Sequence, residues 1–190
     1  MAAAFGRIAR EGFEGLRTRD VAGDVGLNVA TLHYYFPTKE SLIRGVVAHA
    51  MDRFRTTLSP AATPGGRLAA HFAGVRRLYR EEPELFAVMG EVAQRAARDP
   101  AIAAIFNQMS ETWHAALKGL LMRAQADGAI DRGLDPDAVA SLVIASLRGM
   151  FMVPPATISR AQLDKTLLQL ERFIGLGARA RARPGAPRRR

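Results

Sequence analysis

The sequence predicts an all-α protein of about nine helices. Apolar residues recur at intervals of three and four positions, and prolines and glycines separate these stretches from one another. No stretch shows the sustained two-residue alternation, bounded by tight turns, that indicates a β-hairpin. A chain of 190 residues, of which 48% are hydrophobic, is long enough for a small domain joined to a larger one.

The composition excludes several kinds of chemistry. The chain has no cysteine, which rules out disulfides, thiolate metal sites and cysteine nucleophiles. No uncharged stretch approaches the length of a membrane span, so we expect a soluble, cytoplasmic protein that does not enter membranes. The net charge is +9, but six of the arginines lie in the tail GLGARARARPGAPRRR. Because such a run cannot bury apolar surface, we expect residues 178–190 to form a disordered basic tail.

Three short helices are expected in the N-terminal part of the chain. The first has an apolar face that includes Ile8, and Gly12 can close it. Thr18 can cap the second helix and Asn28 the third, while Gly26 separates the two. The spacing therefore predicts two helices joined by a tight glycine turn directly after the first helix.

The remaining helices are longer. Thr38 can cap a fourth helix, whose apolar residues fall every four positions along one stripe. Asp135 and Pro136 supply the N-cap and first turn of the eighth helix, and the Ser-Arg-Ala-Gln sequence at 159–162 is a capping box for the ninth. The helices after the fourth are predicted at residues 66–81, 84–98, 101–126, 136–152 and about 160–175.

The second and third helices have the layout of a helix-turn-helix. Small Ala22 in one helix and Leu32 in the other allow the two helices to cross closely. In this motif the second helix enters the major groove of DNA and presents its N-terminal residues to base edges. We assign Leu32 and Phe36 to the core of this small domain instead of to the DNA contacts.

The stretch TRDVAGDVGLNVATLHYYFPTKESL resembles the DNA-binding signature of the TetR family of transcriptional regulators. The similarity covers residues 3–47 and includes the glycine turn, the aromatic cluster, the Phe-Pro pair and the Lys-Glu-x-Leu sequence at fixed offsets. It implies a helix-turn-helix domain at residues 1–47 and an effector-binding and dimerisation domain at residues 48–177, before the tail. In that family the N-terminal helices bind DNA as a dimer, and the larger domain often holds a small effector.

The resemblance also implies DNA contacts. Arg19 matches a base contact, and an arginine can engage the O6 and N7 atoms of guanine. Val29 and Ala30 match positions that reach base edges but have no hydrogen-bonding atoms, so they can read only thymine methyl groups or shape. Thr18, Thr31, Tyr35 and Lys39 match positions that hold phosphates. His33, where the family usually has tyrosine, and Tyr34 complete the set. Without this motif, we would interpret His33 and Tyr34 as side chains that cover the surface of the small domain, and Arg19 as a solvated surface charge.

Aromatic and methionine residues in the larger domain can be interpreted either as hydrophobic core or as the lining of an effector pocket. At helical spacing such side chains are usually plain core, but an apolar pocket with a few polar groups is what effector sites look like. The resemblance favours a pocket for a small, largely apolar effector. The candidate lining residues are Phe72, Tyr79, Phe86, Met89, Met109, Trp113, His114 and Met150.

Apolar stripes on the last two helices predict a homodimer. Two adjacent helices of this kind can form a four-helix interface with a symmetry mate, and the family uses its last two helices in this way. The residues of the stripes are Val139, Leu142, Val143, Leu147, Leu163, Leu167, Leu170 and Ile174. A monomer in which both stripes are internal core is the alternative.

The function expected from these features is that of a sequence-specific transcriptional regulator, a repressor released from a palindromic double-stranded operator by its effector. The sequence lacks the histidine spacing of a metalloenzyme, a G-x-S-x-G motif and a phosphate-binding glycine loop, so we expect neither an enzyme nor a bound metal or cofactor. The alternative is an architectural protein that binds DNA without sequence preference, through its basic tail and a recognition helix that has few hydrogen-bonding groups.

Overall fold

The computed structural model describes residues 1–58, 63–152 and 159–176 of the chain. Within these ranges the structure has nine α-helices, one short 3-10 helix and no strand, which confirms the predicted all-α fold. None of these helices combines the length and the apolar character needed to cross a bilayer. The elements are α1 (Ala2–Glu11), η1 (Phe13–Gly15), α2 (Thr18–Asp24), α3 (Val29–Tyr35), α4 (Lys39–Arg55), α5 (Pro64–Glu81), α6 (Pro83–Ala96), α7 (Pro100–Ala126), α8 (Pro136–Phe151) and α9 (Arg160–Phe173).

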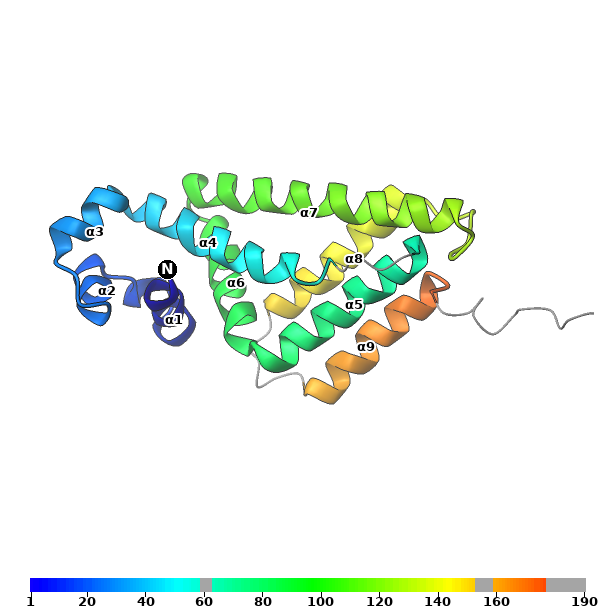
Figure 1. The fold of residues 1–190 in the computed structure, drawn as a ribbon, viewed down its shortest axis with the longest axis horizontal. Coiled ribbons are helices and arrows are strands. Elements are labelled where there is room, and N and C mark those ends of the chain that lie inside the picture. Colours follow the sequence, from blue (N-terminus) through cyan, green and yellow to red (C-terminus); the bar gives the residue numbers. More distant parts are fainter. Residues whose placement is uncertain (59–62, 153–158, 177–190) are drawn as a thin grey trace, which may run out of the picture.

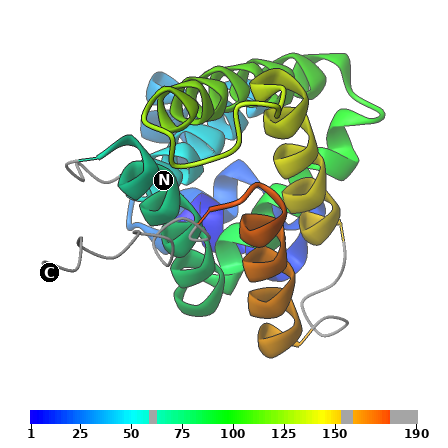
Figure 2. The same cartoon turned by 90° about the vertical axis from the view of Figure 1, so that its right-hand side faces the viewer.

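The N-terminal helices form a small unit at one end of the molecule (Figure 1). Helix α4 leads out of this unit and runs beside α7 into the larger group of helices, and α1 packs against α6. Helix α9 packs against α5, while α8 lies against α6 and α7 (Figure 2). The predicted boundary between residues 47 and 48 falls within α4, and the predicted tail at 178–190 lies outside the described residues.

Most of the expected helix caps are present. The side chain of Asn28 accepts a hydrogen bond from the backbone of Thr31 at 2.7 Å, and Thr38 forms a capping box with Ser41. The predicted N-caps of α8 and α9 are also present, because Asp135 and Ser159 accept hydrogen bonds from the first turn of each helix. For α9 this is one half of the predicted capping box. The prediction for Thr18 was wrong. Arg17 is the N-cap residue, in an extended conformation and without a side-chain cap, so Thr18 is already helical.

The last turn of α4 is anchored in the larger group of helices. Phe54 stacks on Trp113 of α7, with ring centroids 6.1 Å apart, and meets Phe86 of α6 edge-on at 5.8 Å. Arg53 forms a bidentate ion pair with Glu82, between α5 and α6. Aromatic pairs of this kind add stability beyond the area they bury. Because α4 also carries the N-terminal unit, this turn fixes how that unit sits on the rest of the chain, together with the direct contact of α1 with α6.

Gly74 of α5 allows α5 to approach the residues that follow α4. A Cβ atom at Gly74 would lie 2.7 Å from the Cβ atom and 2.8 Å from the Cα atom of Thr57, which is buried. We therefore expect Gly74→Ala to lower the free energy of unfolding by about 1–3 kcal/mol through overpacking, as measured by urea denaturation.

Gly23→Ala is the matched control. A Cβ atom at this helical position in α2 would meet nothing within 4 Å, so the substitution should raise stability by about 0.5–1 kcal/mol. If both variants gain stability, α5 does not approach Thr57 as closely as described.

Candidate functional site

The second and third helices form a compact helix-turn-helix. Val21, Ala22 and Leu32 are buried where α2 and α3 meet. Gly26 has a φ of 69°, a left-handed conformation that favours glycine, and the amide of Leu27 donates to the carbonyl of Ala22 at 2.9 Å. The glycine turn and the small residue at the crossing thus set the angle at which α3 leaves α2.

Helix α3 lies at the free end of the molecule (Figure 1). It presents two large side chains to solvent. Tyr34 is 81% exposed and Tyr35 is 66% exposed, and their rings pack edge to face with centroids 5.2 Å apart. Exposed aromatic side chains that no core covers are typical of a binding surface. The remaining candidate DNA contacts, Thr18, Arg19, Val29, Ala30, Thr31, His33 and Lys39, are all exposed or half-buried.

Two of these candidates have partners within the small unit. The ammonium of Lys39 donates to the carbonyl of Phe13 at 3.3 Å, which ties the start of α4 to η1. A lysine has three N–H donors, so Lys39 keeps donors for a phosphate. The hydroxyl of Thr31 donates to the side chain of Asn28 at 3.0 Å, and it must rotate before it can donate to a phosphate.

An ion-pair cluster that the sequence did not reveal holds α1 to α2. The guanidinium of Arg7 donates to both carboxylate oxygens of Asp24, at 2.6 and 2.8 Å, and lies 3.6 Å from Asp20. The hydrogen bond from Arg7 lowers the pKa of the Asp24 carboxyl below its usual value. Because Arg7 and Asp24 are 17 residues apart, local spacing carries no signal for the contact, which fixes the first helix of the motif.

The structure brings several of the candidate pocket residues into one aromatic cluster. Tyr79 and Phe86 meet edge to face at 4.8 Å, and the contacts of Phe54 connect Phe86 to Trp113. Phe72, Met89, Met109 and Met150 are also buried. These side chains therefore belong to the core of the larger group of helices, and Phe86 and Trp113 lie directly against Phe54 in the last turn of α4.

A buried histidine links this cluster to the end of α4. Nδ1 of His71 lies 2.8 Å from the hydroxyl of Thr57, and the indole N–H of Trp113 donates to Nε2 of His71 at 3.3 Å. Since Nε2 accepts, the hydrogen of a neutral ring is on Nδ1. The Thr57 hydroxyl in turn donates to the carbonyl of Phe54 at 2.6 Å. Burial lowers the pKa of His71 from 6.5 to about 4, so the link is uncharged at neutral pH.

His114 lies apart from the cluster. Its Nε2 atom is 3.3 Å from the carbonyl of Asp137 and 3.1 Å from the hydroxyl of Ser141, both on α8. Across the described ranges, no group of three or more histidine and carboxylate side chains could hold a metal ion.

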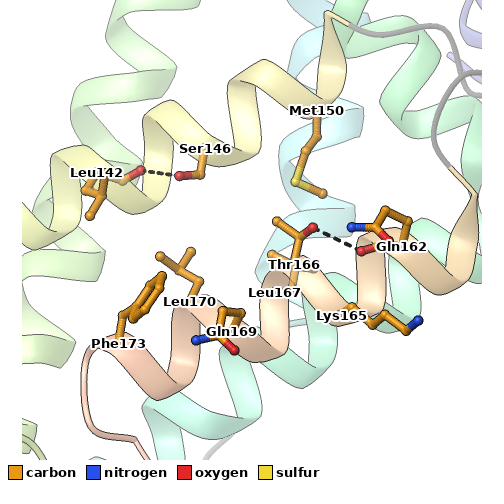
Figure 3. A pocket seen from close by; sticks show the side chains of 10 residues that line it. All are labelled: Leu142, Ser146, Met150, Gln162, Lys165, Thr166, Leu167, Gln169, Leu170 and Phe173. Atoms are coloured by element: carbon orange, nitrogen blue, oxygen red, sulfur yellow. Dashed lines mark hydrogen bonds between the residues drawn. The ribbon is translucent and has the colours of Figure 1, made fainter.

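The apolar stripes of α8 and α9 lie mostly inside the chain. Leu142 is 55% exposed, whereas the other seven predicted interface residues, Val139, Val143, Leu147, Leu163, Leu167, Leu170 and Ile174, are buried. A groove of about 520 Å³ separates the two helices, with Leu142, Ser146 and Met150 on one side and Phe173 at one end of the other (Figure 3). The sequence predicted all eight residues as a dimer interface, with internal core as the alternative, and it did not reveal this groove.

Comparison with known proteins places these features in a family. Residues 1–46 match the profile described as "Bacterial regulatory proteins, tetR family", and residues 61–170 match "Tetracyclin repressor-like, C-terminal domain". The sequence matches none of the curated proteins searched.

Solved structures share the fold at low identity. A TetR-family transcriptional regulator from Rhodococcus sp. is 24% identical, with a TM-score of 0.79 over 91% of this chain and 94% of that chain. A TetR transcription regulator from Haloarcula marismortui is 19% identical, with a TM-score of 0.80 over 91% and 93%. A transcriptional regulator from Saccharomonospora viridis, solved in complex with choline, is 23% identical, with a TM-score of 0.72 over 93% of each chain.

The depressed pKa of His71 predicts a pH-dependent stability. The folded chain keeps His71 neutral down to about pH 4, whereas the unfolded chain protonates it below about pH 6.5. Stability from this group is therefore complete above pH 6.5 and is lost as the pH falls towards 4. Between pH 7.5 and 5.0 we expect a loss of about 2 kcal/mol in the free energy of unfolding.

His71→Gln isolates this effect from that of other titrating groups. The variant should be less stable at pH 7.5, but its loss between pH 7.5 and 5.0 should be smaller than that of the unmodified chain by about the same 2 kcal/mol. Urea denaturation at the two pH values measures both quantities. Parallel pH profiles would contradict the neutral, buried state of His71.

Proposed function

The chain belongs to the TetR family of bacterial regulatory proteins, and from that premise we propose that it is a repressor that binds a palindromic operator as a homodimer and leaves it when a small effector binds. Members of this family are DNA-binding transcriptional regulators with a helix-turn-helix domain, and they are not enzymes. The observation that carries the proposal is the exposed face of α3, held at one end of the molecule by a helix whose other end is embedded in the larger core.

We assign separate roles to the candidate DNA contacts. Arg19, exposed in the first turn of α2, reads a base, and Ala30 lies at the start of α3, where base edges are approached. Tyr35 and Lys39 hold the phosphate backbone, which sets the register of the protein without reading sequence. Thr18, Val29, Thr31, His33 and Tyr34 complete the interface.

We place the dimer interface on the outer face of α8 and α9. This face includes Leu142 and Phe173, the latter 72% exposed, and both line the groove between the two helices (Figure 3). Gly149 lies on the same side of α8, and a Cβ atom there would meet nothing within 4 Å. A symmetry mate that packs its own α8 and α9 onto this face would cover the apolar side chains that the chain leaves exposed.

The effector acts through the aromatic cluster beside the last turn of α4. A small, largely apolar molecule that separates Phe54 from Trp113 would shift the end of α4 and, with it, the distance between the two recognition helices of the dimer. Such a ligand can move the equilibrium only by the difference between its affinities for the two conformations. The effector therefore binds the conformation in which the helices no longer match the half-site spacing.

Selection of random duplex DNA by the full chain, followed by sequencing at near-physiological salt, tests this function. We expect a two-fold-symmetric motif bound at least ~10³-fold more tightly than random DNA. Arg19→Ala should relax the preference at one base of each half-site, whereas Lys39→Ala should weaken binding to all sequences and flatten the salt dependence. Enrichment of no motif, with binding lost when residues 178–190 are removed, would instead indicate an architectural protein.

Leu142→Glu tests the dimer interface. Because Leu142 is exposed in the single chain, the substitution should leave the helical content unchanged but should place a charge in an apolar interface. We expect the dimer dissociation constant to rise by at least ~10-fold, as measured by analytical ultracentrifugation. Met122→Glu is the control, because Met122 is 54% exposed on α7 and does not line the groove between α8 and α9. A dimer of unchanged strength in the Leu142 variant would place the interface elsewhere.

A further inference from the structure

A second pocket opens between α7 and α8, apart from the aromatic cluster. It has a volume of about 380 Å³, and its wall is both polar and apolar. Helix α7 contributes one carboxylate to it, and α8 contributes one guanidinium. The residues that line it are Ser110, Glu111, His114, Ser141, Ile144, Ala145 and Arg148.

Arg148 is held rigidly in this pocket without an acidic partner. Its guanidinium carbon lies 4.7 Å from the centroid of the Phe106 ring, and Nη2 donates to the hydroxyl of Ser110. Burial lowers the pKa of the guanidinium, and no carboxylate of the described residues forms an ion pair with it. The half-buried Arg76, by contrast, is paired with Glu171. A desolvated cation of this kind favours an anion from outside the chain.

Donors remain available for that anion. A guanidinium has five N–H groups, and Ser110 accepts from Arg148 while its own hydroxyl donates to the carbonyl of Phe106 at 2.7 Å. Nε2 of His114 must carry a hydrogen to bond the carbonyl of Asp137, since a carbonyl only accepts. His114 can then donate to Ser141 as well, which leaves the Ser141 hydroxyl free to donate into the pocket.

We propose that this pocket binds the carboxylate of a small organic acid, with Arg148 as its bidentate partner and Ser141 as a further donor. Planar guanidinium and carboxylate groups match in a two-point hydrogen bond, and the contacts of Arg148 with Phe106 and Ser110 hold its guanidinium in the pocket. Ile144, buried at the pocket wall, provides apolar contact for the rest of the acid. The exposed Glu111 also lines the pocket, and its carboxylate disfavours ligands with more than one negative charge. This site is independent of the repressor function proposed above.

Calorimetric titration of the full chain at constant ionic strength tests the proposal. Sodium benzoate is the probe, and benzamide, which has the same shape but no charge, is the control ligand. We expect one saturable benzoate site per chain and affinity for benzamide at least ~10-fold weaker. Arg148→Gln should weaken benzoate binding by at least ~10-fold. Arg148→Lys should weaken it by less, because lysine keeps the positive charge but lacks the two parallel N–H donors of the guanidinium.

Two further variants make the test specific. Glu111→Gln should tighten benzoate binding ~2–5-fold, because it removes a like charge. Arg123→Gln changes an exposed arginine on α7 outside the pocket and should leave the affinity unchanged. The melting temperature of each variant shows that it is folded, and Ser141→Ala offers a milder change, for which we expect a ~3-fold loss.

Three results would overturn the proposal. Benzoate binding that survives Arg148→Gln would mean that the probe binds elsewhere. Equal affinity for benzamide would mean that charge plays no part. Absence of benzoate binding, together with dissociation of a dimer in the Arg148→Gln variant, would mean that Arg148 pairs with a carboxylate of a second copy of the chain.

Discussion

The packing of the last turn of α4 against α6 and α7 is the constraint on which the rest of the structure depends. Helix α4 is continuous from Lys39 to Arg55. Its N-terminal end belongs to the helix-turn-helix unit, while Phe54 lies against the rings of α6 and α7. Any change in the packing around Phe54 must therefore move the recognition helix as well. The contact of α1 with α6 limits that movement to positions that both contacts tolerate.

The same region explains why polar groups are buried in an otherwise apolar core. An unpaired hydroxyl or imidazole in such a core is costly, but Thr57, His71 and Trp113 satisfy one another in a chain of hydrogen bonds that reaches the backbone of α4. This chain is directional, whereas apolar packing is not. It can therefore hold α4 in one register against α5 and α7, with Gly74 allowing the close approach.

Local features of this fold could be predicted from the sequence, and long-range ones could not. The caps at Asn28 and Thr38 depend on residues three positions apart, and the stripe of α4 depends on helical period, so both were expected correctly. The prediction of Thr18 as an N-cap was wrong because N-cap residues and first-turn residues are alike in sequence. The contacts of Arg7 with Asp24 and of His71 with Trp113 join positions 17 and 42 residues apart, for which no local pattern exists.

The last two helices show a related limit. Their apolar spacing predicts buried stripes, and Leu163 and Leu167 are indeed buried. Spacing cannot tell whether a stripe meets its own chain or a second copy, because both remove the same apolar area from water. The exposed positions of Leu142 and Phe173 become informative only once the three-dimensional structure assigns the stripes to the interior.

Native-state hydrogen exchange of the α4 amides can be followed at increasing urea concentration. It shows whether α4 connects the helix-turn-helix unit rigidly to the larger group of helices. We expect amides along the whole of α4 to exchange through the same opening, with the same free energy, as those of α5 and α7. If the N-terminal half of α4 opened together with α2 and α3 at much lower free energy while α5 and α7 stayed protected, α4 would be a hinge and would not connect the two parts rigidly.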